Sequence, residues 1–105
     1  MFTVVKKLEA SVRKIAENKI ARNYITKSIS SGVSLATTEA TNYYEKETSA
    51  YNRIYYVIDG ILILVIDGEH ISLQEGDSCY IEKNTMYEMR GTFKTVVINQ
   101  PAFGS

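Results

Sequence analysis

The sequence predicts an all-β protein with one domain spanning residues 1–105. Runs rich in Val, Ile, Thr and Tyr recur along the chain, and turn-forming pairs such as Asp-Gly separate them at short intervals. Helical periodicity is almost absent, apart from one short stretch near the N-terminus. Many short strands with turn signals between them are typical of a β-sandwich or barrel, so we expect at most one short N-terminal helix.

The composition excludes several classes of protein. Twelve basic residues balance twelve acidic ones, so no overall field would attract nucleic acid or an anionic membrane, and we expect neither as a partner. The longest apolar run, residues 61–66, is far too short to cross a bilayer, and the N-terminus lacks the apolar core of a signal peptide. The single cysteine, Cys79, agrees with a reducing compartment. Together these features predict a soluble cytoplasmic protein.

The N-terminal stretch 4–16 predicts a short amphipathic helix. Its apolar residues follow one another at steps of three and four, with charged residues between them, at Val5, Leu8, Val12 and Ile15. An edge strand is the alternative, because Val4 and Val5 are β-prone and no strong N-cap residue precedes them. In either form we expect this stretch to be a packing element without chemistry.

The next elements are two strands, over residues 20–26 and 33–39, which form a hairpin or a meander corner. The residues between them, 28–32, are rich in turn formers. Residues 40–52 follow no clean period and hold three tyrosines among polar groups. We expect this stretch to be a loop or an irregular strand at the mouth of the barrel.

Two strongly β-prone runs, residues 53–58 and 61–66, form the centre of the chain, and an Asp-Gly pair follows each of them. Asp and Gly tolerate the positive φ angles of tight turns. The pattern therefore predicts a strand, a turn at Asp59-Gly60, a second strand and a turn at Asp67-Gly68. The rest of the chain should pack around this hairpin.

Four short strands complete the pattern, over residues 71–73, 78–81, 86–90 and 93–98. Turn signals separate them at residues 74–77, 83–85 and 91–92, and Pro101 ends the last strand. The all-β prediction thus extends to the C-terminal end of the chain.

Four stretches of the chain resemble the cupins, which are small double-sheet jelly-roll barrels: residues 53–60, 65–68, 73–77 and 80–87. The spacing from Gly60 to Gly68 to the Gly76-Asp77 pair carries the resemblance most specifically. The resemblance implies a single cupin-type double-stranded β-helix of the RmlC-like kind.

The chain departs from this family at each position of the family's metal site. Metal-binding cupins use a His-x-His pair, a glutamate a few residues later and a final histidine. Here the glutamate position is Arg53, the final position is Tyr87, and residues 46–49 contain no histidine. A guanidinium offers no lone pair and its charge repels a cation, so we expect no metal and no other cofactor. We interpret the only histidine, His70, as a solvated neighbour of a turn.

Strand alternation predicts which side chains face the interior. If Arg53 points inward as the family's glutamate does, Tyr55 follows it, and side chains from other strands complete an apolar cup that holds one arginine and two tyrosine hydroxyls. A buried guanidinium needs an anionic partner; either an internal carboxylate, from Glu39, Glu45 or Glu47, or a bound anion satisfies this need. The candidate ligand-binding residues are Arg53, Tyr55, Tyr87, Glu47, Glu39, Cys79 and Met89.

Two functions from different classes are compatible with such an interior. The first is a metal-free module that binds a small anionic or sugar-like molecule through Arg53, Tyr55 and Tyr87. The second is an enzyme resembling the sugar-nucleotide epimerases and isomerases of the family, with Tyr87 as acid and a glutamate as base. Ethanolamine-utilisation cupins also resemble this chain in lacking the histidines, although it has no phosphate-binding glycine loop. Cys79 has no histidine partner and is interpreted as a structural thiol.

The outer face of the central strands predicts a homodimer. The residues that alternate with the inward-facing ones are also aliphatic, where a solvated sheet carries polar side chains: Ile61, Ile63 and Val65. A second copy of the chain would bury this surface. The alternative is an internal cover, either by the stretch 4–16 or by the segment around Phe103.

Overall fold

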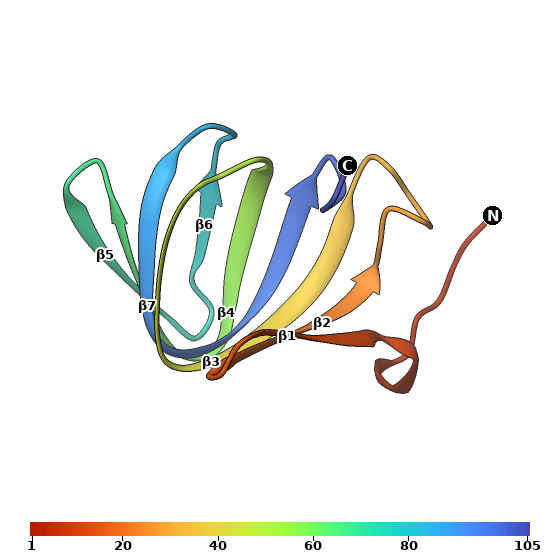
Figure 1. Cartoon of the computed structure of the whole chain (residues 1–105), viewed down its shortest axis with the longest axis horizontal. Helices are drawn as coiled ribbons and strands as arrows, with labels where there is room; N and C mark the ends of the chain where they lie inside the picture. The colour runs from red at the N-terminus through yellow and green to blue at the C-terminus, as the bar shows by residue number, and fades with distance from the viewer.

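The computed structural model describes residues 1–105 and contains one seven-stranded sheet and a single turn of 3-10 helix (Figure 1). The elements are η1 (Lys7–Glu9), β1 (Ser11–Ala16), β2 (Lys19–Ile25), β3 (Ser34–Thr48), β4 (Asn52–Ile66), β5 (Glu69–Gln74), β6 (Ser78–Ile81) and β7 (Met86–Gln100). The sheet order is β1-β2-β3-β7-β4-β5, and β6 pairs with the first half of β4. The all-β prediction is confirmed. No helix has the length and apolar character needed to cross a membrane.

Three long strands give the sheet its barrel shape. The strands β3, β4 and β7 are each 15 residues long. Figure 1 shows them bending at the bottom of the view, so that their two halves lie in facing walls. We call one wall the β2 wall: it contains β1, β2 and β6, with residues 34–40, 52–57 and 93–100 of the long strands. The β5 wall contains β5 and the other halves of the long strands.

Glycine permits the bend where β4 and β7 lie side by side. Gly60 has a φ of +81°, and a Cβ there would lie 2.3 Å from the carbonyl oxygen of Thr92. Gly91 has a φ of +127°, and a Cβ there would lie 2.4 Å from the carbonyl oxygen of Ile61. A side chain would collide with the backbone at both positions. The turns predicted at Asp59-Gly60 and Gly91-Thr92 are therefore wrong, because the chain bends there within continuous strands.

Bulges beside the bend change which residues face the interior. The pairing of β4 with β7 shifts register between Val57 and Asp59, and the pairing of β3 with β7 shifts between Ala40 and Tyr43. An unmatched residue reverses the alternation of the side chains. Buried positions on β4 are accordingly odd-numbered before its bulge and even-numbered after it, and the reverse holds on β3. The inward face predicted for β4 agrees with this burial.

Of the two forms expected for the stretch 4–16, the edge strand is the one that the structure contains, apart from one helical turn. Residues 11–16 form β1, which pairs with β2, and only Lys7–Glu9 is helical. A short amphipathic segment without a strong cap is a marginal helix, whereas β2 offers it a row of unpaired backbone groups. Residues 40–48, expected as a loop or an irregular strand, continue β3 past its bulge. The predicted hairpin of β2 with β3 and the turn at Asp67-Gly68 are both present.

The hydrophobic core lies between the two walls and at the bend. Its fully buried side chains include Leu62, Leu64 and Met89, and Tyr43 and Phe93 pack with them in one cluster. Burying each large aliphatic side chain stabilises the fold by about 1.5–3 kcal/mol. The inner face of β2 carries Lys19, Ala21, Asn23 and Ile25 instead, so this side of the interior is more polar.

Candidate functional site

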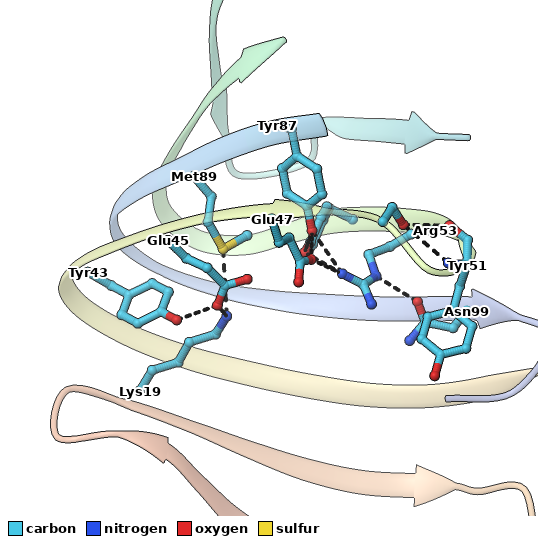
Figure 2. Close-up of polar contacts among 11 residues, drawn as sticks. Lys19, Tyr43, Glu45, Glu47, Tyr51, Arg53, Tyr87, Met89 and Asn99 are labelled. Carbon is cyan, nitrogen blue, oxygen red and sulfur yellow. Dashed lines mark hydrogen bonds and ion pairs between the residues drawn. The ribbon is translucent and has the colours of Figure 1, made fainter. Parts of the chain in front are cut away.

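Arg53 lies inside the barrel near the start of β4, with 7% of its surface exposed. Its Nε donates a hydrogen bond to Asn99 Oδ1 at 2.6 Å, and its Nη1 donates to Tyr87 Oη at 2.8 Å and to the Glu47 carboxylate. Tyr87 Oη also donates to Glu47 and lies 2.7 Å from Tyr55 Oη. We call these five residues the Arg53 cluster; Figure 2 shows the Glu47 carboxylate facing the guanidinium at its centre.

The strand register assembles this cluster from both walls. Asn99 is the β7 partner of Arg53 in the β2 wall. Glu47 and Tyr87 are partners of each other in the β5 wall. The long arginine side chain spans the interior between the two pairs, and its planar guanidinium can donate to several acceptors at once. The Arg53–Glu47 ion pair therefore connects the two walls.

The cluster is charged at the arginine and protonated at the tyrosines. Burial alone would lower the pKa of Arg53, but the neighbouring Tyr55, Tyr87 and Glu47 outweigh this effect, so the guanidinium keeps its charge. Burial raises the pKa of Tyr55 and of Tyr87. Both phenols therefore remain neutral hydrogen-bond donors, and neither is suited to act as a base near neutral pH.

One nitrogen of Arg53 has no hydrogen-bond partner within the protein. The protein's hydrogen bonds to this guanidinium use Nε and Nη1 and none uses Nη2. No buried side-chain nitrogen or oxygen in the structure lacks a partner, so Nη2 must contact open space. Figure 2 shows Nη2 pointing away from Glu47 and Tyr87.

That open space is a cavity of about 420 Å³ between the inner face of β1 and β2 and the rest of the barrel. Four basic residues line it, Arg13, Lys19, Lys27 and Arg53, against two acidic ones, Glu45 and Glu47, so basic side chains outnumber acidic ones by two. Amide and hydroxyl groups complete the polar part of the wall, from Asn23, Asn99, Ser34 and Thr38. Such a lining favours a small anion with further hydrogen-bonding groups.

Lys19 is a second buried basic residue in the same cavity. Only 6% of the residue is exposed, and its Nζ lies 3.8 Å from Glu45 Oε1, 3.6 Å from Met89 Sδ and 4.5 Å from the centre of the Tyr43 ring. Tyr43 donates a hydrogen bond to the same Glu45 oxygen. Burial lowers the pKa of Lys19 despite the attraction of Glu45. Sequence reasoning missed Lys19 because it began this strand at Ile20; alternation backward from Ala21 would have placed the lysine inside.

The structure gathers four of the seven predicted site residues: Arg53, Tyr55, Tyr87 and Glu47. Glu39 lies elsewhere, because it points outward before the β3 bulge and forms an ion pair with Arg22 at 3.5 Å. Its proposed pairing with Arg53 is therefore wrong.

Cys79 and Met89, the other two predicted site residues, lie outside the Arg53 cluster. Cys79 is half-buried beside the core, its Sγ contacts the Tyr80 carbonyl at 3.8 Å, and burial raises the pKa of its thiol. It does not line the cavity. Met89 is fully buried and does not line the cavity either; its Sδ lies 3.6 Å from Lys19 Nζ.

The residues at the family's metal position do not fit a divalent cation. The one carboxylate there, Glu47, is already bound by the Arg53 guanidinium, whose charge would repel a cation. No group of three His, Cys, Asp or Glu side chains with a metal-binding arrangement occurs in the structure. The exposed His70 lies outside the barrel, where its Nδ1 is 3.4 Å from Nη2 of Arg90.

Several solved structures share this architecture. EutQ from Clostridium difficile is 24% identical over 81% of this chain, with a TM-score of 0.76, and the chain spans 64% of that structure's length. KdgF from Halomonas sp. is 12% identical, with a TM-score of 0.85 over 99% of this chain and 97% of its own. A tyrosine-to-phenylalanine variant of Streptomyces Pac13 with uridine is 13% identical, with a TM-score of 0.84 over 99% of this chain and 85% of its own. At these identities the likeness shows the fold alone.

At the level of sequence, no curated protein matches the chain. A family model described as "Cupin domain" matches residues 40–98. This range covers more than half of the chain and includes Glu45, Glu47, Arg53 and Tyr87. The strand order, the bend at the two glycines and this match agree with one another, and the chain is a member of the cupin domain family.

Proposed function

We propose that this protein binds a small, hydroxylated organic anion inside the barrel, with the anionic group on Nη2 of Arg53. The observation that carries the proposal is that the protein's own hydrogen bonds use only part of the guanidinium. Two of its nitrogens are held by Asn99, Tyr87 and Glu47, while the third contacts a cavity lined by more basic than acidic side chains. The protein thus fixes the orientation of the guanidinium and leaves one donor edge free.

An internal ion pair without a ligand is the simpler alternative. Glu47 does neutralise Arg53, but a purely structural pair needs no open volume beside it. A cavity of about 420 Å³ is large enough for a small metabolite. Asn23 and Asn99, with the hydroxyls of Ser34 and Thr38, could hydrogen-bond the hydroxyl groups of a sugar acid.

One solved neighbour supports the hydroxylated character of the ligand. Pac13 is a nucleoside dehydratase, and one of its structures contains uridine, a polyhydroxylated molecule. At least one barrel of this fold therefore admits a hydroxylated small molecule. The epimerase alternative has weaker support here, because burial raises the pKa of Tyr87 and the Glu47 carboxylate is already bound by Arg53.

Isothermal titration calorimetry with a panel of hexuronates and aldonates, and with the matching neutral sugars, tests the proposal. We expect at least one anion to bind the wild type and its neutral counterpart to bind at least tenfold more weakly, a difference of about 1.4 kcal/mol. Arg53→Met should abolish this binding, whereas the control Arg22→Met, which removes an arginine from the outer face, should retain it. Equal binding by Arg53→Met, or no binding of any anion in the panel, would overturn the proposal.

A further inference from the structure

The amine of Lys19 is buried among poor hydrogen-bond acceptors. An ammonium has three donors, yet the contacts of Nζ are with a thioether sulfur at 3.6 Å, a carboxylate oxygen at 3.8 Å and the centre of an aromatic ring at 4.5 Å. A thioether is a weak acceptor, and 3.8 Å is too long for a hydrogen bond. The ring and the carboxylate attract a charged amine, but without strong hydrogen bonds they offset only part of the hydration lost on burial, and burial favours the neutral form.

The charges that face Lys19 partly oppose one another. Glu45 and Glu47 stabilise the ammonium, while Arg53 and Arg13 destabilise it, and burial has the largest effect. Burial therefore lowers the pKa of Lys19, and a larger fraction of the amine is unprotonated than in an exposed lysine. An unprotonated lysine amine in a cavity is a nucleophile.

Groups that can move protons lie beside this amine. Glu45 Oε1, which lies 3.8 Å from Nζ, accepts a hydrogen bond from Tyr43. Figure 2 shows Lys19, Glu45 and Tyr43 together, with Glu47 and Arg53 farther along the same interior. Lys19 and Arg53 line the same cavity, so a ligand that contacts both must be long enough to reach from the amine to the guanidinium.

We propose that Lys19 forms an imine with the carbonyl carbon of a small oxo acid whose carboxylate lies on Arg53. The proposal rests on the proposed function only for the carboxylate contact. The ligand is then a carbonyl compound, and the reacting group of the protein is the Lys19 amine.

The reaction balances without an oxidant or a reductant. The amine adds to the carbonyl carbon, and one of its protons passes through Glu45 to the oxygen, which gives a carbinolamine. The second proton passes to the hydroxyl, which leaves as water while the nitrogen lone pair forms the C=N bond. One amine and one carbonyl thus give one imine and one water.

Reductive trapping tests the inference. The folded protein is incubated separately with glyoxylate, pyruvate and 4-oxobutanoate, briefly reduced with cyanoborohydride, and analysed by intact mass and peptide mapping. We expect a single adduct on Lys19 with at least one of the three acids. Its rate should exceed that at the exposed Lys14, because a larger fraction of the Lys19 amine is unprotonated. Adducts spread evenly over the lysines, or none on Lys19, would overturn the inference. Lys19 and Lys14 are compared within the wild-type protein, so the result does not depend on whether a variant folds.

Variants separate this inference from the proposed function. Lys19→Arg should lose the fast adduct, and the control Lys14→Arg should keep it; loss in both or retention in both would contradict the role of Lys19. Arg53→Met should slow trapping of the oxo acid while sparing trapping of the neutral aldehyde propanal by Lys19. If Arg53→Met affects neither, the imine stands and the carboxylate contact fails. If sugar acids bind as proposed but Lys19 is never trapped, the imine fails and the binding function stands.

Discussion

The two buried cations of the barrel differ in how well their charge is compensated. Arg53 has a carboxylate, two phenols and an amide around it, whereas Lys19 has a distant carboxylate and a sulfur. A guanidinium that keeps its charge suits the holding of an anion, and an amine that loses its proton suits addition to a carbonyl. The neighbours of each residue thus assign different chemistry to two basic side chains in one cavity.

Removing the carboxylate of the Arg53–Glu47 pair should destabilise the protein more than removing the guanidinium. Glu47→Gln leaves a buried guanidinium without its carboxylate and should lower the free energy of unfolding by about 2–4 kcal/mol. Arg53→Met replaces the charge with an apolar side chain of similar length and should stay within about 1 kcal/mol of the wild type, since the Glu47 side chain is 33% exposed and keeps contact with water. Urea unfolding of both variants measures the difference. A larger loss in Arg53→Met than in Glu47→Gln would contradict this account.

At the scale of the strands, residue type predicted their existence better than their connections. Glycine with positive φ has the same sequence signature in a hairpin turn as in a bulge, so Gly60 and Gly91 were predicted as turns although both lie within continuous strands. The difference depends on the neighbouring strand, since β4 and β7 pair on both sides of the bend. Local sequence contains no information about that pairing.

The same bulges explain which site residues could be predicted. Alternation from Arg53 placed Tyr55 correctly because no bulge separates them. Glu39, Glu45 and Glu47 have the same parity, yet the β3 bulge between Ala40 and Tyr43 turns Glu39 outward and the other two inward. Without the position of the bulge, the sequence could not choose the partner of Arg53.

Substituting the glycines at the bend tests this geometry. Gly60→Ala should lower the free energy of unfolding by about 3 kcal/mol or more, because positive φ and contact with a backbone oxygen act together. Gly68→Ala is the matched control: its φ is +77°, but no atom lies within 4 Å of the added Cβ, so only the conformational cost of about 1 kcal/mol applies. Chemical denaturation of both variants gives the comparison. Equal losses in the free energy of unfolding would show that the backbones of β4 and β7 are not in close contact at Gly60.

At the scale of the whole molecule, neither predicted internal cover reaches the outer face of β4. The stretch 11–16 pairs with β2 at the far edge of the sheet, and Phe103 packs against Tyr51 and Arg13 instead. Ile61 is 50% exposed, and Ile63 and Val65 are half-buried. Polar partners flank the three on both neighbouring strands, at Thr92, Arg90 and Glu88 of β7 and at Gln74, Ser72 and His70 of β5.

We propose that a second copy of the chain covers this aliphatic row. Fully burying one such side chain contributes about 1.5–3 kcal/mol to the free energy of association. These side chains are already partly buried in the monomer, so each contributes less. A dimer at micromolar concentration therefore needs an interface that extends beyond the three residues of each subunit. Ile58, 43% exposed on the same strand, could extend it.

Light scattering coupled to size exclusion measures the mass of the wild type and of Ile63→Glu. We expect a dimer that this substitution converts to a monomer, since a carboxylate at the centre of the row would be desolvated on both sides of the two-fold axis. Val12→Glu, on the exposed strand β1, is the control and should remain dimeric.

The outer face of the β2 wall also has exposed apolar residues, at Ile54, Tyr56 and Tyr80. Ile54 of β4 pairs with Tyr80 of β6, and Tyr56 lies two residues farther along β4. If Tyr56→Glu separates the subunits and Ile63→Glu does not, the interface lies on the β2 wall; a wild-type monomer would contradict the dimer altogether.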